Sequence, residues 1–339
     1  MTDFQQEKKK LIDALNKPVK VSADINRAEK EMKKHIGFDK EKKTFLNHMK
    51  VYSMTQGRFW PERKVNCYSS APGMGKTTFV KNLADAMGRD CVPISLAGFK
   101  ESGEFSILGD STKPSLVALA IKEWGSKNPV ILLDELEKVE DEKVQTDLIQ
   151  LFQDYKEKKK FTDKYFQTEI DLGHITFFAT VNYIDSLATK LKDKVNVIEL
   201  PDFTDEEKEK ILKMKAEEIN NKYLKKEGSN IITENAIKEI LKRIKEVGIR
   251  QSERALHKIE QDYIHVKNKG GKFTATENPQ EWVKRNVFPY QEEFMANWKH
   301  YSLFFLLGLN FVLLASWIFK RFIIKSEITT NRNRTKNKK

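Results

Sequence analysis

Short runs of consecutive apolar residues alternate along the chain with longer stretches in which apolar residues recur roughly every three to four positions. The recurrent pattern predicts helices over 79–87, 116–124 and 144–155. The continuous runs predict buried strands over 65–69, 91–96, 130–134, 175–180 and 195–200. Buried strands that alternate with helices are typical of a parallel sheet covered on both faces, so we expect an α/β domain over 58–202.

Helical spacing predominates on both sides of this domain. Residues 1–57 are rich in lysine and glutamate, and Ile12, Leu15 and Val19 are predicted to form an apolar stripe on one helix. After Pro201 the pattern is helical throughout. The predicted units outside the α/β domain are a helical lead-in over 1–57, an all-helical unit over 203–269 and a linker over 270–300.

Residues 301–319 form a run without a formal charge, in which Asn310 is the only strongly polar side chain. A membrane-spanning helix needs about 20 predominantly apolar residues, and basic and aromatic residues flank this run as they do such helices. We therefore predict a C-terminal transmembrane helix over 301–319, followed by a basic tail over 320–339. A buried core helix is the alternative.

Charge and cysteine content narrow the possible functions. The 61 lysines and arginines exceed the 49 acids by 12, but the segment 320–339 alone contributes eight basic residues against one acid. The basic excess is thus mostly a property of the tail, and we expect no nucleic acid partner. With only Cys67 and Cys91, a disulfide framework and a four-cysteine zinc site are excluded. The N-terminus shows no apolar secretory signal.

Residues 70–77, Ser-Ala-Pro-Gly-Met-Gly-Lys-Thr, fit the Walker A phosphate loop except for serine at its first position. Glycines allow backbone N–H groups to converge on one anion, and the following helix adds its positive N-terminus. Lys76 is expected to reach the β- and γ-phosphates, and the Thr77 hydroxyl is expected to bind Mg²⁺. The predicted ATP-binding residues here are Pro72, Gly73, Met74, Gly75, Lys76, Thr77 and Thr78.

Two later strands end in polar side chains. The run 130–134 ends with Asp134 and is followed by Glu135, so we expect Asp134 to hold Mg²⁺ and Glu135 to polarise the attacking water. The alternative is a helix that simply begins with two favourable acids. Asn182 follows the strand 175–180, where its amide could hold that water, or where it could be an ordinary turn residue.

The order of these motifs resembles the ATPase module of Lon proteases, in the AAA+ family, over about Ala23 to Lys258. The segment 125–138, Gly-Ser-Lys-Asn-Pro-Val-Ile-Leu-Leu-Asp-Glu-Leu-Glu-Lys, is very similar to the Lon region around the Walker B acids. The resemblance implies a P-loop NTPase fold with an all-α lid, and ATP hydrolysis between subunits of a homo-oligomeric, hexameric ring that pulls on polypeptides. It also implies that His35 and Ile36 pack on adenine, that Asn182 is sensor 1 and that Arg250 is the sensor-2 residue.

The chain departs from the Lon pattern in several places. Where Lon carries an Asp-Arg pair with its arginine finger, this chain has Asp193-Lys194, so Lys194 is either a weaker catalytic finger or a solvated loop lysine. The substrate grip is predicted at Ile107-Leu108-Gly109, and the alternative is that this loop merely packs. We also expect neither the protease domain nor the large N-terminal domain of Lon.

These observations predict a membrane-anchored, Lon-like AAA+ ATPase that uses Mg²⁺·ATP to remodel, unfold or extract proteins and is not itself a protease. A separate protease is a possible partner. The alternative is an ATP-binding membrane scaffold with little turnover, and a DNA-acting loader ranks last. The basic charge of the tail favours its placement on the cytoplasmic side of the membrane, and the need for ATP favours the same side for the ATPase. A single membrane-spanning helix between the two cannot place both on one side. We expect a C-terminal anchor with the ATPase in the cytosol or an equivalent ATP-rich compartment.

Overall fold

The computed structural model describes the following residues: 3–19, 24–54, 63–97, 99, 106–157, 159–227, 230–245 and 247–269. Residues up to His257 belong to one compact unit, and the chain from Lys258 onward belongs to a second. The predicted linker, transmembrane helix and basic tail lie outside the described residues. Within the described ranges, no helix combines the length and the apolar character that crossing a membrane requires.

A parallel five-stranded sheet in the order β2-β3-β6-β1-β7 confirms the predicted α/β fold. The three inner strands are buried almost throughout, which is why their sequences are mostly apolar. Each predicted strand lies within one residue of its observed position. The strands are β1 (Val65–Ser69), β2 (Cys91–Ser95), β3 (Val130–Asp134), β6 (Thr176–Val181) and β7 (Val195–Glu199).

The register of the inner strands brings their C-terminal ends to one edge of the sheet. Ser69 pairs with Val181, and Leu133 pairs with Ala179. The residues that follow β1, β3 and β6 therefore meet, although they are far apart in sequence. This edge is where open parallel sheets place their ligands.

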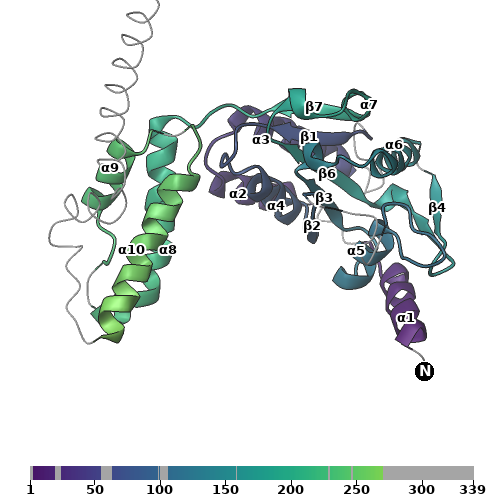
Figure 1. Ribbon diagram of the computed structural model, residues 1–339, viewed down its shortest axis with the longest axis horizontal. Coiled ribbons are helices and arrows are strands. Elements are labelled where there is room, and N and C mark those ends of the chain that lie inside the picture. Colours follow the sequence, from purple (N-terminus) through teal and green to yellow (C-terminus); the bar gives the residue numbers. More distant parts are fainter. Residues whose placement is uncertain are drawn as a thin grey trace, which may run out of the picture. The chain divides into compact units, whose positions relative to one another are not determined.

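Helices cover both faces of the sheet (Figure 1). On one side lie α2 (Ile25–Lys34), α3 (Asp39–Met54) and α4 (Lys76–Ala86), and on the other lie α5 (Leu116–Trp124) and α6 (Glu142–Lys156). The three predicted helices thus exist, and α4 and α6 begin a few residues earlier than the apolar spacing indicated.

The first helix, α1 (Asp3–Asn16), packs on α5 and contributes to the core of the α/β domain. Its buried residues are Leu11 and Ala14, whereas Ile12 is 39% exposed. The predicted stripe was therefore wrong for Ile12, whereas Leu15 does pack against the core. Four apolar residues lie close together in this helix, so its sequence permits more than one buried face. The contact with α5 determines which face is buried.

An antiparallel hairpin of β4 (Lys160–Asp163) and β5 (Thr168–Asp171) was not predicted. Its strands are four residues long and mostly polar, so they carry no clear apolar alternation. Asp163 is fully buried and accepts hydrogen bonds from the backbone N–H groups of Phe166 and Ser115, both at 2.7 Å. Asp163 thus ties the hairpin to the loop ahead of α5.

That loop contains the predicted substrate grip, and the structure contradicts this prediction. Ile107 is 1% exposed, and Leu108 packs against the same hydrophobic core. Gly109 has a φ of +75°, and a Cβ there would lie 2.8 Å from the Ser115 nitrogen. Because the loop folds back tightly, its apolar side chains face the core and cannot hold a substrate.

The remaining elements are one short helix after β3, short helices around β5–β7 and the longer helices after Pro201. The turn Thr204 to Glu207 forms a capping box, since the Thr204 N–H donates to the Glu207 carboxylate and the Glu207 N–H donates to Thr204 Oγ1. These elements are η1 (Leu136–Lys138), η2 (Leu172–His174), η3 (Ile184–Ser186), α7 (Thr189–Lys192), α8 (Asp205–Glu227), α9 (Glu234–Arg243) and α10 (Arg250–Asn268).

Candidate functional site

A cavity of about 250 Å³ lies at the C-terminal edge of β1, β3 and β6. It brings together the phosphate loop, the two acids after β3, the amide after β6 and the predicted sensor-2 arginine, all as the sequence indicated. Thr180, Ile249 and Glu253 complete it. Its lining is Gly73, Met74, Gly75, Lys76, Thr77, Thr78, Asp134, Glu135, Thr180, Asn182, Ile249, Arg250 and Glu253.

The phosphate loop has the backbone shape that anion binding requires. Gly73 and Gly75 have φ values of +82° and +75°, a region that glycine enters without steric cost. Helix α4 begins directly afterwards, and its first N–H groups face this loop. Ser70, which replaces the usual first glycine, does not have a positive φ, so its side chain causes no backbone strain.

Lys76 is 8% exposed and fully hydrogen-bonded. Its Nζ donates to the backbone oxygens of Ser70 at 2.7 Å and Ala71 at 3.1 Å, and to Asn182 Oδ1 at 2.9 Å. Burial lowers the pKa of Lys76, and the nearby carboxylates of Glu137 and Asp134 oppose that shift. A phosphate oxygen could take the place of one of these acceptors without moving the helix.

The pair predicted to bind Mg²⁺ is in contact. The Thr77 hydroxyl donates to Asp134 at 3.1 Å, and the Thr180 hydroxyl donates to the same carboxylate. These are hard oxygen donors of the kind that Mg²⁺ prefers, and Mg²⁺ usually takes few protein ligands and completes its shell with phosphate and water. Among the described residues no cluster of three or more His, Cys, Asp or Glu could hold a metal. The donor set fits Mg²⁺ bound together with a nucleotide.

Glu135 has an unusual backbone conformation, with a φ of +60° directly after β3. A non-glycine residue in this region costs on the order of 1 kcal/mol or more. The Glu135 N–H donates to Thr180 Oγ1 at 3.1 Å, which helps to hold the turn. The turn leaves Glu135 at the cavity, one residue from Asp134, which is predicted to bind Mg²⁺.

Sequence reasoning missed two residues that organise the site, Thr180 and Glu137. Thr180 is two residues before Asn182, so the period of two in a strand could have placed both on one face. Glu137 Oε1 accepts hydrogen bonds from the Asn182 backbone N–H at 3.1 Å and from Nδ2 at 2.7 Å. No local pattern indicates that contact, because it depends on how the chain turns after β3.

The segment Gly248-Ile249-Arg250 packs directly on the phosphate loop. The Ile249 N–H donates to the Gly73 carbonyl at 3.1 Å. A Cβ on Gly248 would lie 2.8 Å from both the Pro72 oxygen and the Gly73 carbonyl carbon. This approach explains how Arg250, distant in sequence, reaches the cavity.

We expect Gly248→Ala to weaken ATP binding about tenfold, because the new methyl group would force the lid segment away from the backbone of the phosphate loop. Gly173→Ala is a matched control, since its Cβ would meet only the exposed Asp171 side chain. Titration of each variant with a fluorescent ATP analogue measures the affinities. Equal affinities in Gly248→Ala and wild type would show that this contact does not shape the site.

A second cavity of about 120 Å³ adjoins the first and shares Gly75, Thr78, Ile249 and Glu253 with it. His35 and Ile36, the residues predicted to pack on adenine, line it. Phe38, Phe79 and Phe203 form an aromatic cluster beside His35, with ring centroids 5.0 to 5.4 Å apart. The predicted adenine residues therefore lie next to the predicted phosphate site.

His35 is 8% exposed, and burial lowers its pKa to about 4. Its Nδ1 is 2.8 Å from Asn82 Nδ2, which can only donate, so the neutral ring carries its hydrogen on Nε2. That Nε2 is buried and has no hydrogen-bond partner among the described residues. His35 thus offers one unused N–H group in a residue that lines the second cavity.

Acidification from pH 7 to pH 5 should destabilise the protein by about 2 kcal/mol through His35. The unfolded histidine takes up a proton near pH 6.5, whereas the folded one does so only near pH 4, so the contribution is complete above 6.5 and is lost as the pH falls. Urea unfolding at both pH values measures it. His35→Gln should lose this pH dependence, and His265→Gln, at an exposed position, should retain it.

Lys194 does not line either cavity. It is exposed and lies between α7 and β7, at the N-terminal end of a strand that runs parallel to β1. The phosphate loop follows the C-terminal end of β1, so Lys194 lies at the opposite edge of the sheet. Any catalytic role for Lys194 would therefore be toward the site of another subunit.

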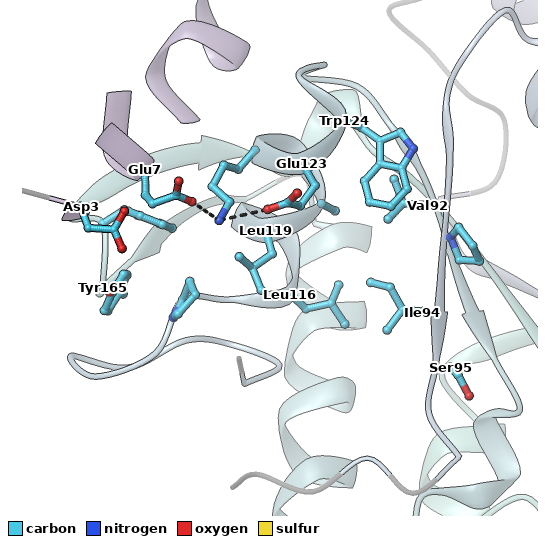
Figure 2. A pocket seen from close by; sticks show the side chains of 15 residues that line it. Asp3, Glu7, Val92, Ile94, Ser95, Leu116, Leu119, Glu123, Trp124 and Tyr165 are labelled. Atoms are coloured by element: carbon cyan, nitrogen blue, oxygen red, sulfur yellow. Dashed lines mark hydrogen bonds and ion pairs between the residues drawn. The ribbon is translucent and has the colours of Figure 1, made fainter. Parts of the chain in front are cut away.

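A third cavity of about 790 Å³, larger than the two described above, lies elsewhere (Figure 2). It is bounded by α1, α5, the edge strand β2 and the β4–β5 turn. Lys122 forms ion pairs with Glu7 of α1 and with Glu123, which ties α1 to α5 beside this cavity. None of the predicted site residues lines it.

Much of the chain is similar in sequence to known proteins. Residues 67–201 match the family described as "ATPase family associated with various cellular activities (AAA)". Lon protease of Halothermothrix orenii is 28% identical over 293 residues, which are 82% of this chain and 36% of that protein. Lon protease 4 of Sorangium cellulosum is 32% identical over 238 residues, which are 66% of this chain and 29% of that protein.

The chain thus spans about a third of the length of these relatives. A solved structure of the Thermotoga maritima RuvB Holliday junction branch migration motor is 18% identical, with a TM-score of 0.46 over 68% of this chain and 64% of that one.

Proposed function

We propose that this chain, in which residues 67–201 match the AAA family of ATPases and which is similar to part of the Lon proteases, hydrolyses Mg²⁺·ATP and uses the energy to remodel, unfold or extract proteins. The observation that carries the ATPase proposal is the convergence on one cavity of Lys76, Thr77, Asp134, Glu135 and Arg250. These residues come from three separate segments, and each is of the type that phosphoryl transfer requires.

In the proposed reaction, the loop N–H groups and Lys76 bind the phosphates, and Thr77 and Asp134 hold Mg²⁺. Water attacks the γ-phosphorus, the bond to the β-phosphate oxygen breaks, and Glu135 accepts the proton that the water loses. Mg²⁺ supplies charge stabilisation to the phosphates. In the second cavity, the unused His35 Nε2–H would donate to a ring nitrogen of adenine.

The remaining parts of the proposal rest on the sequence. Remodelling of polypeptides and assembly into a ring rest on the relation to Lon, and the exposed Lys194 is available to a neighbouring subunit. Anchoring to a membrane rests on the uncharged run at 301–319. Replacement of the arginine finger by Lys194 favours the second candidate, a membrane scaffold that binds ATP but turns it over slowly.

Steady-state phosphate release by the full chain, in detergent, tests the proposal. We expect release that requires Mg²⁺, is abolished by excess EDTA and increases when an unfolded polypeptide is added. A chain that binds ATP and assembles on binding it, yet releases no phosphate, would be the scaffold. A chain that neither binds nor hydrolyses ATP would contradict both candidates.

A further inference from the structure

Two neighbours of Asn182 require the same orientation of its amide. Glu137 Oε1 accepts from Nδ2 at 2.7 Å, and Lys76 Nζ donates to Oδ1 at 2.9 Å. A carboxylate can only accept and a lysine ammonium can only donate, so turning the amide over would break both hydrogen bonds. The side chain therefore presents an acceptor, not a donor, beside Lys76.

The turn after β3 holds Glu137 in this position. Glu135 adopts its positive φ, η1 follows, and the fully buried Leu136 anchors the turn in the core. The Asn182 backbone N–H also donates to Glu137 Oε1, at 3.1 Å, so one carboxylate oxygen fixes both the backbone and the side chain of Asn182.

The Glu137 carboxylate does not lie where water could fully solvate it, as its second oxygen shows. Oε2 is buried and has no hydrogen-bond partner among the described residues. Burial, together with the nearby charge of Glu137, raises the pKa of the buried Cys67 thiol to about 12. A buried, incompletely paired carboxylate is costly to maintain, which favours a role beyond stability.

We propose that Glu137 is a positioning residue that locks Asn182 with Oδ1 toward Lys76, so that Asn182 accepts a hydrogen bond from the attacking water. The inference rests on the proposed ATP hydrolysis. When Lys76 donates to a phosphate, Asn182 Oδ1 is left as a free acceptor. A phosphate oxygen has no hydrogen to donate to Oδ1, whereas water has two, so the locked amide selects water. Glu137 itself touches neither water nor phosphate in this role.

The test exchanges the acid and the amide. Asn182→Asp alone places two carboxylates against each other at the 2.7 Å contact, and we expect kcat to fall at least tenfold. In the double variant Glu137→Gln/Asn182→Asp, the new amide nitrogen donates to the new carboxylate, which still accepts from Lys76. The nitrogen cannot accept from the backbone N–H of residue 182 as Oε1 does, so the rescue is expected to be partial. The double variant should regain at least threefold in kcat over Asn182→Asp, with KM for ATP within threefold of wild type.

A matched control adds Glu140→Gln to Asn182→Asp, because Glu140 is exposed and carries the same charge without touching Asn182. This control should restore nothing. A double variant no faster than Asn182→Asp would overturn the proposed role of Glu137.

If thermal unfolding shows that Asn182→Asp does not fold, the single variant Glu137→Gln tests the proposed role of Glu137 instead. Its kcat should fall with KM unchanged, and a kcat within twofold of wild type would overturn the role. A wild-type chain that releases no phosphate overturns the proposed function and this inference together. An active wild type without rescue overturns only the role of Glu137.

Discussion

Replacing Glu135 with glutamine is expected to slow ATP hydrolysis by roughly 10²–10⁴-fold while ATP still binds. The amide has the same shape but cannot take the proton from the attacking water. The positive φ of Glu135, and the hydrogen bond from its N–H to Thr180, do not depend on the carboxylate, so the turn should persist. Phosphate release and ATP titration of the same preparation measure the two effects.

Glu140→Gln is the control for Glu135→Gln, because Glu140 is exposed and lies five residues further along the same segment. It should hydrolyse ATP at the wild-type rate. If Glu135→Gln were as fast as this control, the water would be activated by another group, and the assignment of Glu135 as general base would be wrong.

Lys76→Met should weaken ATP binding by about 10- to 100-fold. Hydrogen bonds to charged groups contribute about 1.5–3 kcal/mol each, and methionine keeps the length of the side chain without its charge. Folding should be retained, because the substitution removes a buried charge whose pKa burial already lowers. Calorimetric titration with Mg²⁺·ATP measures the affinity, and thermal unfolding checks the fold.

The matched control for Lys76→Met is Lys81→Met, on the exposed face of α4. It removes the same charge from the same helix, so it separates the specific contact from the general electrostatic attraction of the phosphates. Equal loss of affinity in both variants would show that Lys76 acts only through net charge.

The parts of the fold that could be predicted are those whose signal is local. The inner strands are buried on both faces, so they are mostly apolar and were located within one residue. The phosphate loop was recognisable because Gly73 and Gly75 need torsions that few other residues adopt.

Errors arose where the local pattern permits more than one answer. In α1 both Ile12 and its neighbour Leu11 are apolar, and packing on α5 buried Leu11. The Ile107 loop reads as an exposed apolar grip, yet Asp163 of the hairpin draws the loop onto the core. In both cases a partner distant in sequence determined which side chain is buried.

The sequence by itself indicated the candidate chemistry of this protein: a loop of the type that binds phosphate, two acids suited to metal and water, and the order of strands and helices along the chain. Only the tertiary structure decided that Glu137 holds Asn182, that Gly248 rests on the phosphate loop and that Lys194 lies away from its own site. The physical reason is that torsional preferences and apolar periodicity are properties of neighbouring residues. Hydrogen bonds and close backbone approaches between distant segments depend on strand order and register.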